Sequence, residues 1–238
     1  MVRIIKGEQP KVLADNADKW KKEYLSCIDA GKKPSKRLAS AYNHPTIKKA
    51  LEDETHGKCA YCESKITHID HGDIEHILPK NKNARPDLCY EWSNLTLACT
   101  KCNQSGKGDY YNKECLLINP YNDDPDVHFV PFGSLVLPFA GDERAEVTEN
   151  RLGLNRERLL ERRKERIDML MALLKMWKTT APSSPMKSII EGQLHNEYDN
   201  SKEFSFTVRG LLAAQKFPVK NVMSCTYTHK PHPKGQPK

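Results

Sequence analysis

Cys59-Ala60-Tyr61-Cys62, then Asp73-Ile74-Glu75-His76-Ile77-Leu78-Pro79, then Cys99-Thr100-Lys101-Cys102-Asn103 form the stretch that decides the fold. The two C-x-x-C pairs supply four thiolates, the number of ligands that a tetrahedral structural zinc requires. The gap between the pairs is longer than in an ordinary two-knuckle zinc ribbon, so a folded insert is expected between them. The sequence therefore predicts a closed zinc site made of Cys59, Cys62, Cys99 and Cys102, with no open position for catalysis.

The insert contains two segments with the pattern of short strands. Asp73–Ile77 alternates apolar and polar residues and stops before Pro79, and Asn94–Leu97 has a similar pattern. The stretch 80–87 is rich in Lys, Asn and Pro, which is typical of a polar loop. We therefore expect two short strands joined by a loop between the cysteine pairs.

The order C-x-x-C, E-H-I-x-P, Asn94-Leu95 and C-x-x-C-N resembles the motif of the HNH, or ββα-metal, endonucleases. In that family a β-hairpin and one helix hold a single divalent cation beside a catalytic histidine. The resemblance implies an α+β fold, in which a zinc-stapled ββα-metal core is flanked by N-terminal and C-terminal α-helices. It also implies hydrolysis of phosphodiester bonds in nucleic acid.

The resemblance further implies a role for each matching residue. His76 would be the general base, because a neutral imidazole can take a proton from water near neutral pH. Glu75 and Asn103 would supply hard oxygen ligands to Mg²⁺ or Mn²⁺. Asn94 would hold the ring of His76, or its loop, in place. Asn103 would thus serve both in catalysis and in binding the cation.

Three details depart from the common pattern of the family. Glu75 stands where many members have aspartate, and Asn103 stands where others have histidine. Lys107 follows Asn103 at a slightly unusual distance. Lys107 and Lys101 are nevertheless close enough in sequence to be expected at the phosphate. The histidines His56, His68 and His71 match no position of the motif and are expected to be structural or solvent-facing.

The flanking sequence resembles one HNH subfamily more narrowly, the PtuB nuclease component of Septu-type anti-phage systems, some of which are attached to retrons. The matching stretches are Ile4-Ile5-Lys6, Leu116–Pro120 with the acidic run after it, and Leu152-Gly153-Leu154-Asn155. This resemblance implies an ABC-type ATPase partner, PtuA. In retron-linked versions it adds a reverse transcriptase and its DNA–RNA product.

Composition sets wider limits on the class of protein. The 238 residues carry a formal net charge of +7, which permits phosphate binding but does not establish it. No run of eighteen apolar residues occurs, so no membrane span is expected, and the N-terminus lacks the apolar run of a signal peptide. The cytoplasm is therefore the expected compartment. The other cysteines, Cys27, Cys89, Cys115 and Cys225, are expected to be buried thiols.

Patterning along the chain predicts five regions. They are an N-terminal helical segment 1–54, the nuclease core with its zinc site 55–112, an extended connection 113–150, a C-terminal helical region 151–228 and a disordered basic tail 229–238. Strands are expected at Val127–Phe132 and Leu135–Phe139. Helices are expected at Thr46–Glu54, from Arg151 onward, at Met186–Tyr198 and at Glu203–Gln215.

Two alternatives to a DNA endonuclease remain open on sequence grounds. The same site could cut RNA, including transfer RNA, because only the 2′-hydroxyl separates the two polymers and no base-reading motif is present. A non-catalytic zinc module that binds nucleic acid or protein would need the cysteines but not His76.

Overall fold

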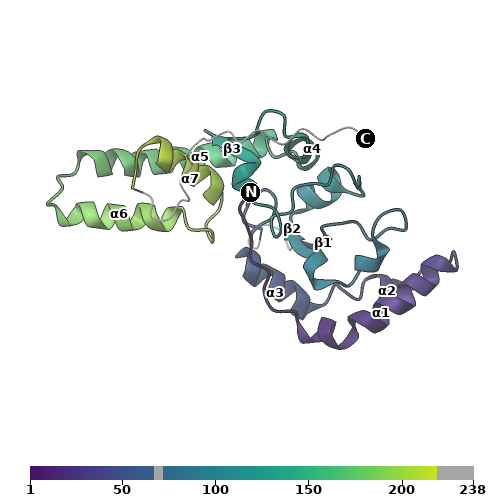
Figure 1. Cartoon of the computed structure of the whole chain (residues 1–238). Helices are drawn as coiled ribbons and strands as arrows, with labels where there is room; N and C mark the ends of the chain where they lie inside the picture. Colours follow the sequence, from purple (N-terminus) through teal and green to yellow (C-terminus); the bar gives the residue numbers. More distant parts are fainter. Residues whose placement is uncertain (67–71, 219–238) are drawn as a thin grey trace.

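The computed structural model describes residues 1–66 and 72–218. Its strands form two small antiparallel sheets of two strands each, and its helices lie around these sheets (Figure 1). The expectations for His68, His71, Cys225 and the tail 229–238 lie outside the described residues. None of the described helices combines the length and the apolar character that crossing a membrane requires.

Three helices build the N-terminal part, α1 (Lys11–Asp29), α2 (Lys36–Ala39) and α3 (Pro45–Thr55). The helices are separated at Gly31, which has a positive φ of 66°, and Pro45 occupies the first turn of α3. Helix α3 packs against strand β2 (Leu95–Ala98) and buries Ile47 and Leu51. The N-terminal helices therefore cover one side of the central hairpin.

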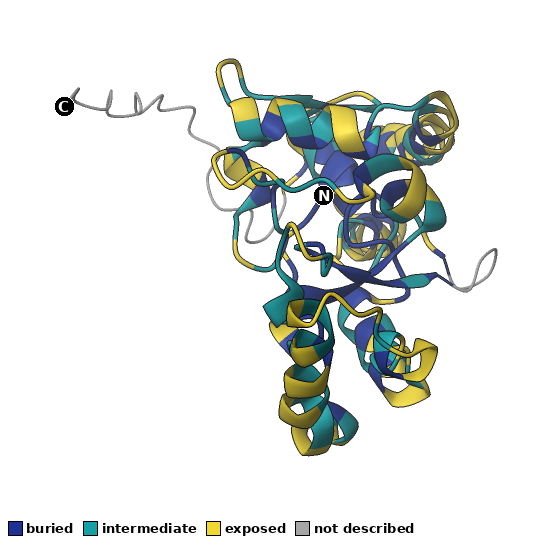
Figure 2. Cartoon of the chain, turned by 90° about the vertical axis from the view of Figure 1, so that its right-hand side faces the viewer, coloured by how far each residue is buried: buried dark blue, intermediate teal, exposed yellow. Residues whose placement is uncertain are grey.

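The hairpin joins β1 (Asp73–His76) to β2, with Asp73 opposite Ala98 and His76 opposite Leu95. Short 3-10 turns, η1 (Pro86–Leu88) and η2 (Trp92–Asn94), shape the connection between them. Every residue of β2 is buried, and the strands lie among the buried residues of the core (Figure 2). The predicted pair of strands is confirmed, although the first strand ends one residue earlier than expected and the second is shifted by one residue toward the C-terminus.

The third element of the ββα unit is the π-helix η3 (Lys101–Lys107). Its widened turn includes a hydrogen bond from the amide of Gly108 to the carbonyl oxygen of Asn103, at 2.8 Å. A π-turn accommodates one residue more than an α-turn. This geometry gives a physical reason for the unusual spacing between Asn103 and Lys107.

Gly106 allows η3 to lie close to α4 (Glu143–Leu152). A Cβ at this position would lie 2.7 Å from the carbonyl oxygen of Arg151 and 3.0 Å from that of Lys101. We expect Gly106→Ala to cost about 1–3 kcal/mol of unfolding free energy, because backbone has to move to make room. Thermal unfolding should show a fall of several degrees in Tm.

Gly192→Ala is the matched control for this substitution. A Cβ at Gly192, on helix α6 (Pro185–Glu197), would meet nothing within 4 Å. It should leave stability unchanged or raise it slightly, because alanine favours the helix. Equal Tm values for the two variants would contradict the close packing of η3.

The second half of the chain contains η4 (Pro125–Val127), a hairpin of β3 (Phe129–Phe132) and β4 (Leu135–Pro138), and helices α4 to α7. Helix α5 spans Glu157–Thr179 and α7 spans Ser205–Ala214. Helices α5 and α6 form an elongated pair that extends away from the sheet (Figure 1). Together with α7 they enclose a second apolar cluster, made of Leu170, Leu174, Ile190, Leu194, Val208, Leu212 and Phe217.

The expectation of a connection without helix up to residue 150, followed by a helix from Arg151, is wrong. Residues 143–152 form α4, and the long helix begins only at Glu157. Asp142 caps α4 by accepting a hydrogen bond from the amide of Ala145, and Gly153 ends it with a φ of 56°. The acidic first turn and the glycine after Leu152 are helix signals that the prolines upstream obscured.

Candidate active site

The four cysteines of the two knuckles meet at one point. The sulfur atoms of Cys59, Cys62, Cys99 and Cys102 all lie within 4.8 Å of one another, and those of Cys62 and Cys99 are 3.8 Å apart. Zinc–sulfur bonds of about 2.3 Å in a tetrahedron set sulfur atoms about 3.8 Å apart. The donor set and its spacing therefore fit a structural zinc ion, as the sequence predicts.

Two charged side chains connect this cysteine site to the C-terminal helices. The guanidinium of Arg156, at the N-cap of α5, lies 3.5 Å from the sulfur of Cys62, 3.7 Å from that of Cys102 and 3.9 Å from that of Cys99. A cation at this distance offsets the negative charge that four thiolates carry. The start of α5 is thereby fixed against the knuckles.

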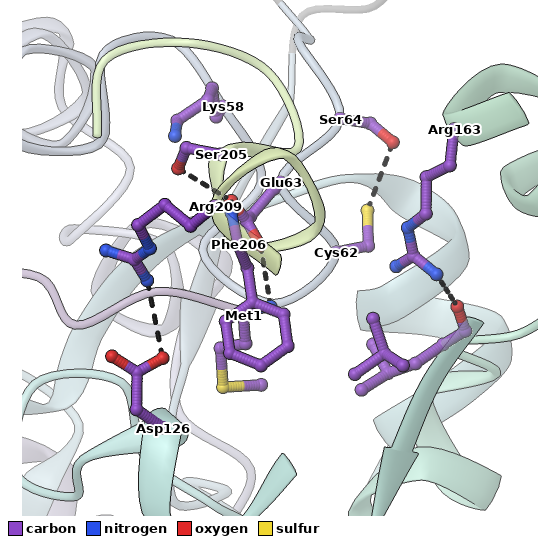
Figure 3. Close-up of polar contacts among 12 residues, drawn as sticks. Met1, Lys58, Cys62, Glu63, Ser64, Asp126, Arg163, Ser205, Phe206 and Arg209 are labelled. Carbon is purple, nitrogen blue, oxygen red and sulfur yellow. Dashed lines mark hydrogen bonds and ion pairs between the residues drawn. The ribbon is translucent and has the colours of Figure 1, made fainter. Parts of the chain in front are cut away.

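Glu63, directly after Cys62, makes the second connection (Figure 3). Its carboxylate pairs with the Met1 ammonium at 2.7 Å and accepts hydrogen bonds from the Ser205 hydroxyl and the Phe206 amide at the start of α7. Burial alone would raise the pKa of Glu63, but the Met1 ammonium and Lys58 lower it to about 2. The carboxylate is therefore ionised, and it holds α7 to the first knuckle.

His76, the last residue of β1, is buried, with 6% of its surface exposed. Its Nε2 lies 2.8 Å from the carbonyl oxygen of Cys89. Because a carbonyl oxygen only accepts, Nε2 carries the hydrogen and Nδ1 carries the lone pair. Burial lowers the pKa of His76 to about 3, with the charges of Lys80 and Lys107 acting in the same direction. The imidazole is therefore neutral, with Nδ1 as the atom that can accept a proton.

Asn94 fixes the backbone that follows His76. Its Oδ1 accepts from the amide of Leu78 at 2.8 Å, and its Nδ2 donates to the carbonyl oxygens of Leu78 and Leu88 at 2.9 and 3.2 Å. Its own carbonyl oxygen accepts from the amide of Ile77. Asn94 thus contacts the loop after His76 rather than the imidazole itself.

Hard oxygen donors gather where β1 faces η3. Asp73 and Glu75 are two residues apart in the strand and share a face. Nδ2 of Asn103 donates to Oδ2 of Asp73 at 3.0 Å, and Nε2 of Gln104 donates to the same oxygen at 3.3 Å. Since this bond uses the NH₂ end of the Asn103 amide, its Oδ1 is left as the end that can bind a cation.

Glu75 and Lys107 form a buried ion pair, with Nζ and Oε1 2.5 Å apart. Burial raises the pKa of Glu75 even though the adjacent Lys107 ammonium opposes this. Lys107 is only 4% exposed, so the expectation that it contacts phosphate does not fit its position, whereas Lys101 is exposed.

The donor set of this face fits a hard divalent cation. The carboxylates of Asp73 and Glu75 and the ammonium of Lys107 together leave one net negative charge beside Oδ1 of Asn103. Mg²⁺ and Mn²⁺ prefer such oxygen ligands. Of the residues that carry this arrangement, the sequence interpretation missed Asp73, although strand alternation places it on the face of Glu75. It also missed Arg156, for which the sequence offers no signal.

A β-hairpin followed by a short helix, with a buried neutral histidine at the end of the first strand, fits the ββα-metal class of nucleases, and the four-cysteine site lies beside this unit. The family model described as HNH endonuclease matches residues 59–107. The retron Vc95 "putative HNH endonuclease" of Vibrio cholerae is 30% identical over 185 residues, which cover 72% of this chain and 85% of that protein. The chain belongs to the HNH endonuclease family.

Two further relatives are Septu proteins named PtuB. The one from Bacillus mycoides is 29% identical over 198 residues, which cover 68% of this chain and 66% of that protein. The one from Bacillus thuringiensis is 28% identical over 250 residues, which cover 98% and 91%. No solved structure matches this chain significantly.

Proposed function

We propose that this nuclease hydrolyses phosphodiester bonds of nucleic acid, with DNA as the default substrate, as the effector of a bacterial anti-phage defence system. The observation that carries the chemistry is the fixed tautomer of His76 on the same strand as Asp73 and Glu75. The Septu and retron relatives support the defence role.

In the proposed mechanism Nδ1 of His76 takes a proton from the attacking water, while Nε2 keeps its hydrogen bond to Cys89. Asn94 keeps the loop, and with it the imidazole, in a fixed position. Glu75 and Asn103 are the proposed ligands of Mg²⁺ or Mn²⁺, which when bound would neutralise charge on the phosphate and the leaving oxygen. For Glu75 this role would use Oε2, because Oε1 is the oxygen that pairs with Lys107.

The proposed partners follow from the relatives. We infer that the chain acts with a PtuA-like ABC-type ATPase, and in a retron setting also with a reverse transcriptase and its DNA–RNA product. The C-terminal helices are the proposed contact for the ATPase, because α5 and α6 extend away from the sheet (Figure 1) while Arg156 ties the start of α5 to the cysteine site.

The test is cleavage by the chain purified with its ATPase partner, in Mg²⁺, of plasmid and of total RNA in separate reactions with the activating signal present. Cut plasmid supports DNA as the substrate. Cleavage of RNA, including transfer RNA, supports the same mechanism with RNA in place of DNA as the substrate. If neither polymer were cut while zinc and fold were intact, a non-catalytic zinc module would be the better description.

A further inference from the structure

The positive charge of this chain is concentrated in one short stretch. Residues 30–51, called here the basic segment, contain six of the 38 Lys and Arg residues and no Asp or Glu. The remainder of the chain has 32 basic residues against 31 acidic ones. Nearly all of the net charge of +7 therefore originates in this segment.

Four of its cations are available to a ligand. Lys32, Lys33, Lys36 and Arg37 are all exposed, and none of them forms an ion pair with another residue in the described ranges 1–66 and 72–218. On the exposed face of α5, acidic side chains pair with two of the exposed cations Arg158, Arg162, Lys164 and Lys175. There, Arg162 pairs with Glu165 and Lys164 pairs with Asp168, as is usual for a solvated helix face.

The basic segment is attached to the catalytic histidine. The ring of Tyr42 meets that of His76 edge-on, with centroids 4.5 Å apart. Lys80 donates a hydrogen bond to the carbonyl oxygen of Ala39 at 3.0 Å and lies over the Tyr42 ring. The hydroxyl of Tyr90 donates to the carbonyl oxygen of Leu38 at 2.5 Å. These contacts hold the backbone of α2, which carries Lys36 and Arg37, in a fixed position relative to His76.

We propose that the basic segment is the surface along which the sugar–phosphate backbone of the substrate lies as it reaches His76. This inference rests on the proposed nuclease function and names the part of the molecule that holds the substrate. A run of unpaired cations neutralises phosphates and releases their counterions without reading sequence. The segment thus supplies affinity, while the face of β1 supplies the chemistry.

The test compares two variants of the full chain in a His76→Ala background, which prevents cleavage during binding measurements. The first replaces Lys32, Lys33, Lys36 and Arg37 with glutamine. The second replaces four exposed cations of α5, Arg158, Arg162, Lys164 and Lys175, with glutamine. The two variants remove equal charge, and α5 lies at the opposite end of the molecule from α2 (Figure 1).

Fluorescence anisotropy with labelled duplex DNA and single-stranded RNA over a range of salt concentrations measures the effect. For the first variant we expect Kd to rise at least tenfold at low salt. Each lost phosphate contact should lower the slope of log K against log salt by about 0.7–0.9, so the full change is about 3. The α5 variant should keep nearly the parent slope. With His76 intact, the first variant should show a raised KM and a nearly unchanged kcat.

Equal slopes for the two variants, with Tm values unchanged, would overturn the inference. So would loss of binding to the ATPase partner with nucleic-acid binding retained, which would make the segment a protein-docking surface. Failure of the proposed function gives a different result, because the parent chain would then cut neither polymer. If the parent cuts nucleic acid and the first variant binds it as tightly as the parent does, only the present inference fails.

Discussion

Cleavage by the His76→Ala variant should fall by about 10²–10⁴-fold, the usual contribution of a general base. His76 lies at the end of β1, and its hydrogen bond to the carbonyl oxygen of Cys89 fixes the neutral tautomer of its imidazole. Alanine removes the Nδ1 lone pair and leaves the carboxylates and Asn103 in place. Single-turnover cleavage at saturating Mg²⁺ measures the chemical step apart from substrate binding.

The control for this variant is His56→Asn, which also removes one imidazole. His56 is exposed and has a φ of 55°, a conformation that asparagine tolerates. It should cut at the parent rate. Because alanine also removes the contact with Tyr42 and the bond to Cys89, Tm and zinc content of the His76 variant must match the parent. Undiminished cleavage by a folded His76→Ala protein would end the proposed mechanism.

Loss of zinc should unfold the nuclease region. Structural zinc sites contribute apparent binding free energies of about 10–16 kcal/mol, as large as the whole unfolding free energy of a typical domain, about 5–15 kcal/mol. The hairpin it would staple is short, with four residues in each strand. Cys59→Ser or Cys102→Ser should therefore lower the bound zinc well below one ion per chain and abolish cleavage. The thermal unfolding transition of the nuclease region should disappear. Metal analysis and circular dichroism measure these effects.

Cys27→Ser is the matched control, since Cys27 lies on α1 outside the group of four. It should keep one zinc per chain and the parent Tm. The α5–α6–α7 region encloses an apolar cluster of its own, so we expect part of the helical signal to survive in the Cys59 variant. A Cys59 variant that kept its zinc and its Tm would show that the four-cysteine assignment is wrong.

The cluster of the four cysteines and the two strands could be predicted because their signals are local. C-x-x-C spacing, alternation and a terminating proline each fix a few neighbouring residues. The partners of the charged side chains could not be predicted in this way. Lys107 is expected at the phosphate from its place in the sequence, but at the end of the π-helix η3 it pairs with Glu75.

Contacts between the cysteine site and residues far away in the chain could not be predicted from the sequence either. Arg156 is 54 residues from Cys102 in the chain, yet its guanidinium lies beside that sulfur. The boundary between α4 and α5 was missed because prolines dominate the connection that precedes it. The composition of the basic segment can be read from the sequence, but its position relative to His76, the proposed general base, depends on the contact between Tyr42 and His76.

The attachment of α5 to the thiolates has a mechanical consequence. The long helical pair is anchored at its base by Arg156 on the sulfur atoms and by Glu63 on α7. The four-cysteine site therefore connects the ββα unit to the base of α5, while the distal part of α5 and α6 extends away from the sheet (Figure 1). A protein bound to the distal part of this pair would therefore have a defined orientation relative to the ββα unit, set by the contacts of Arg156 and Glu63.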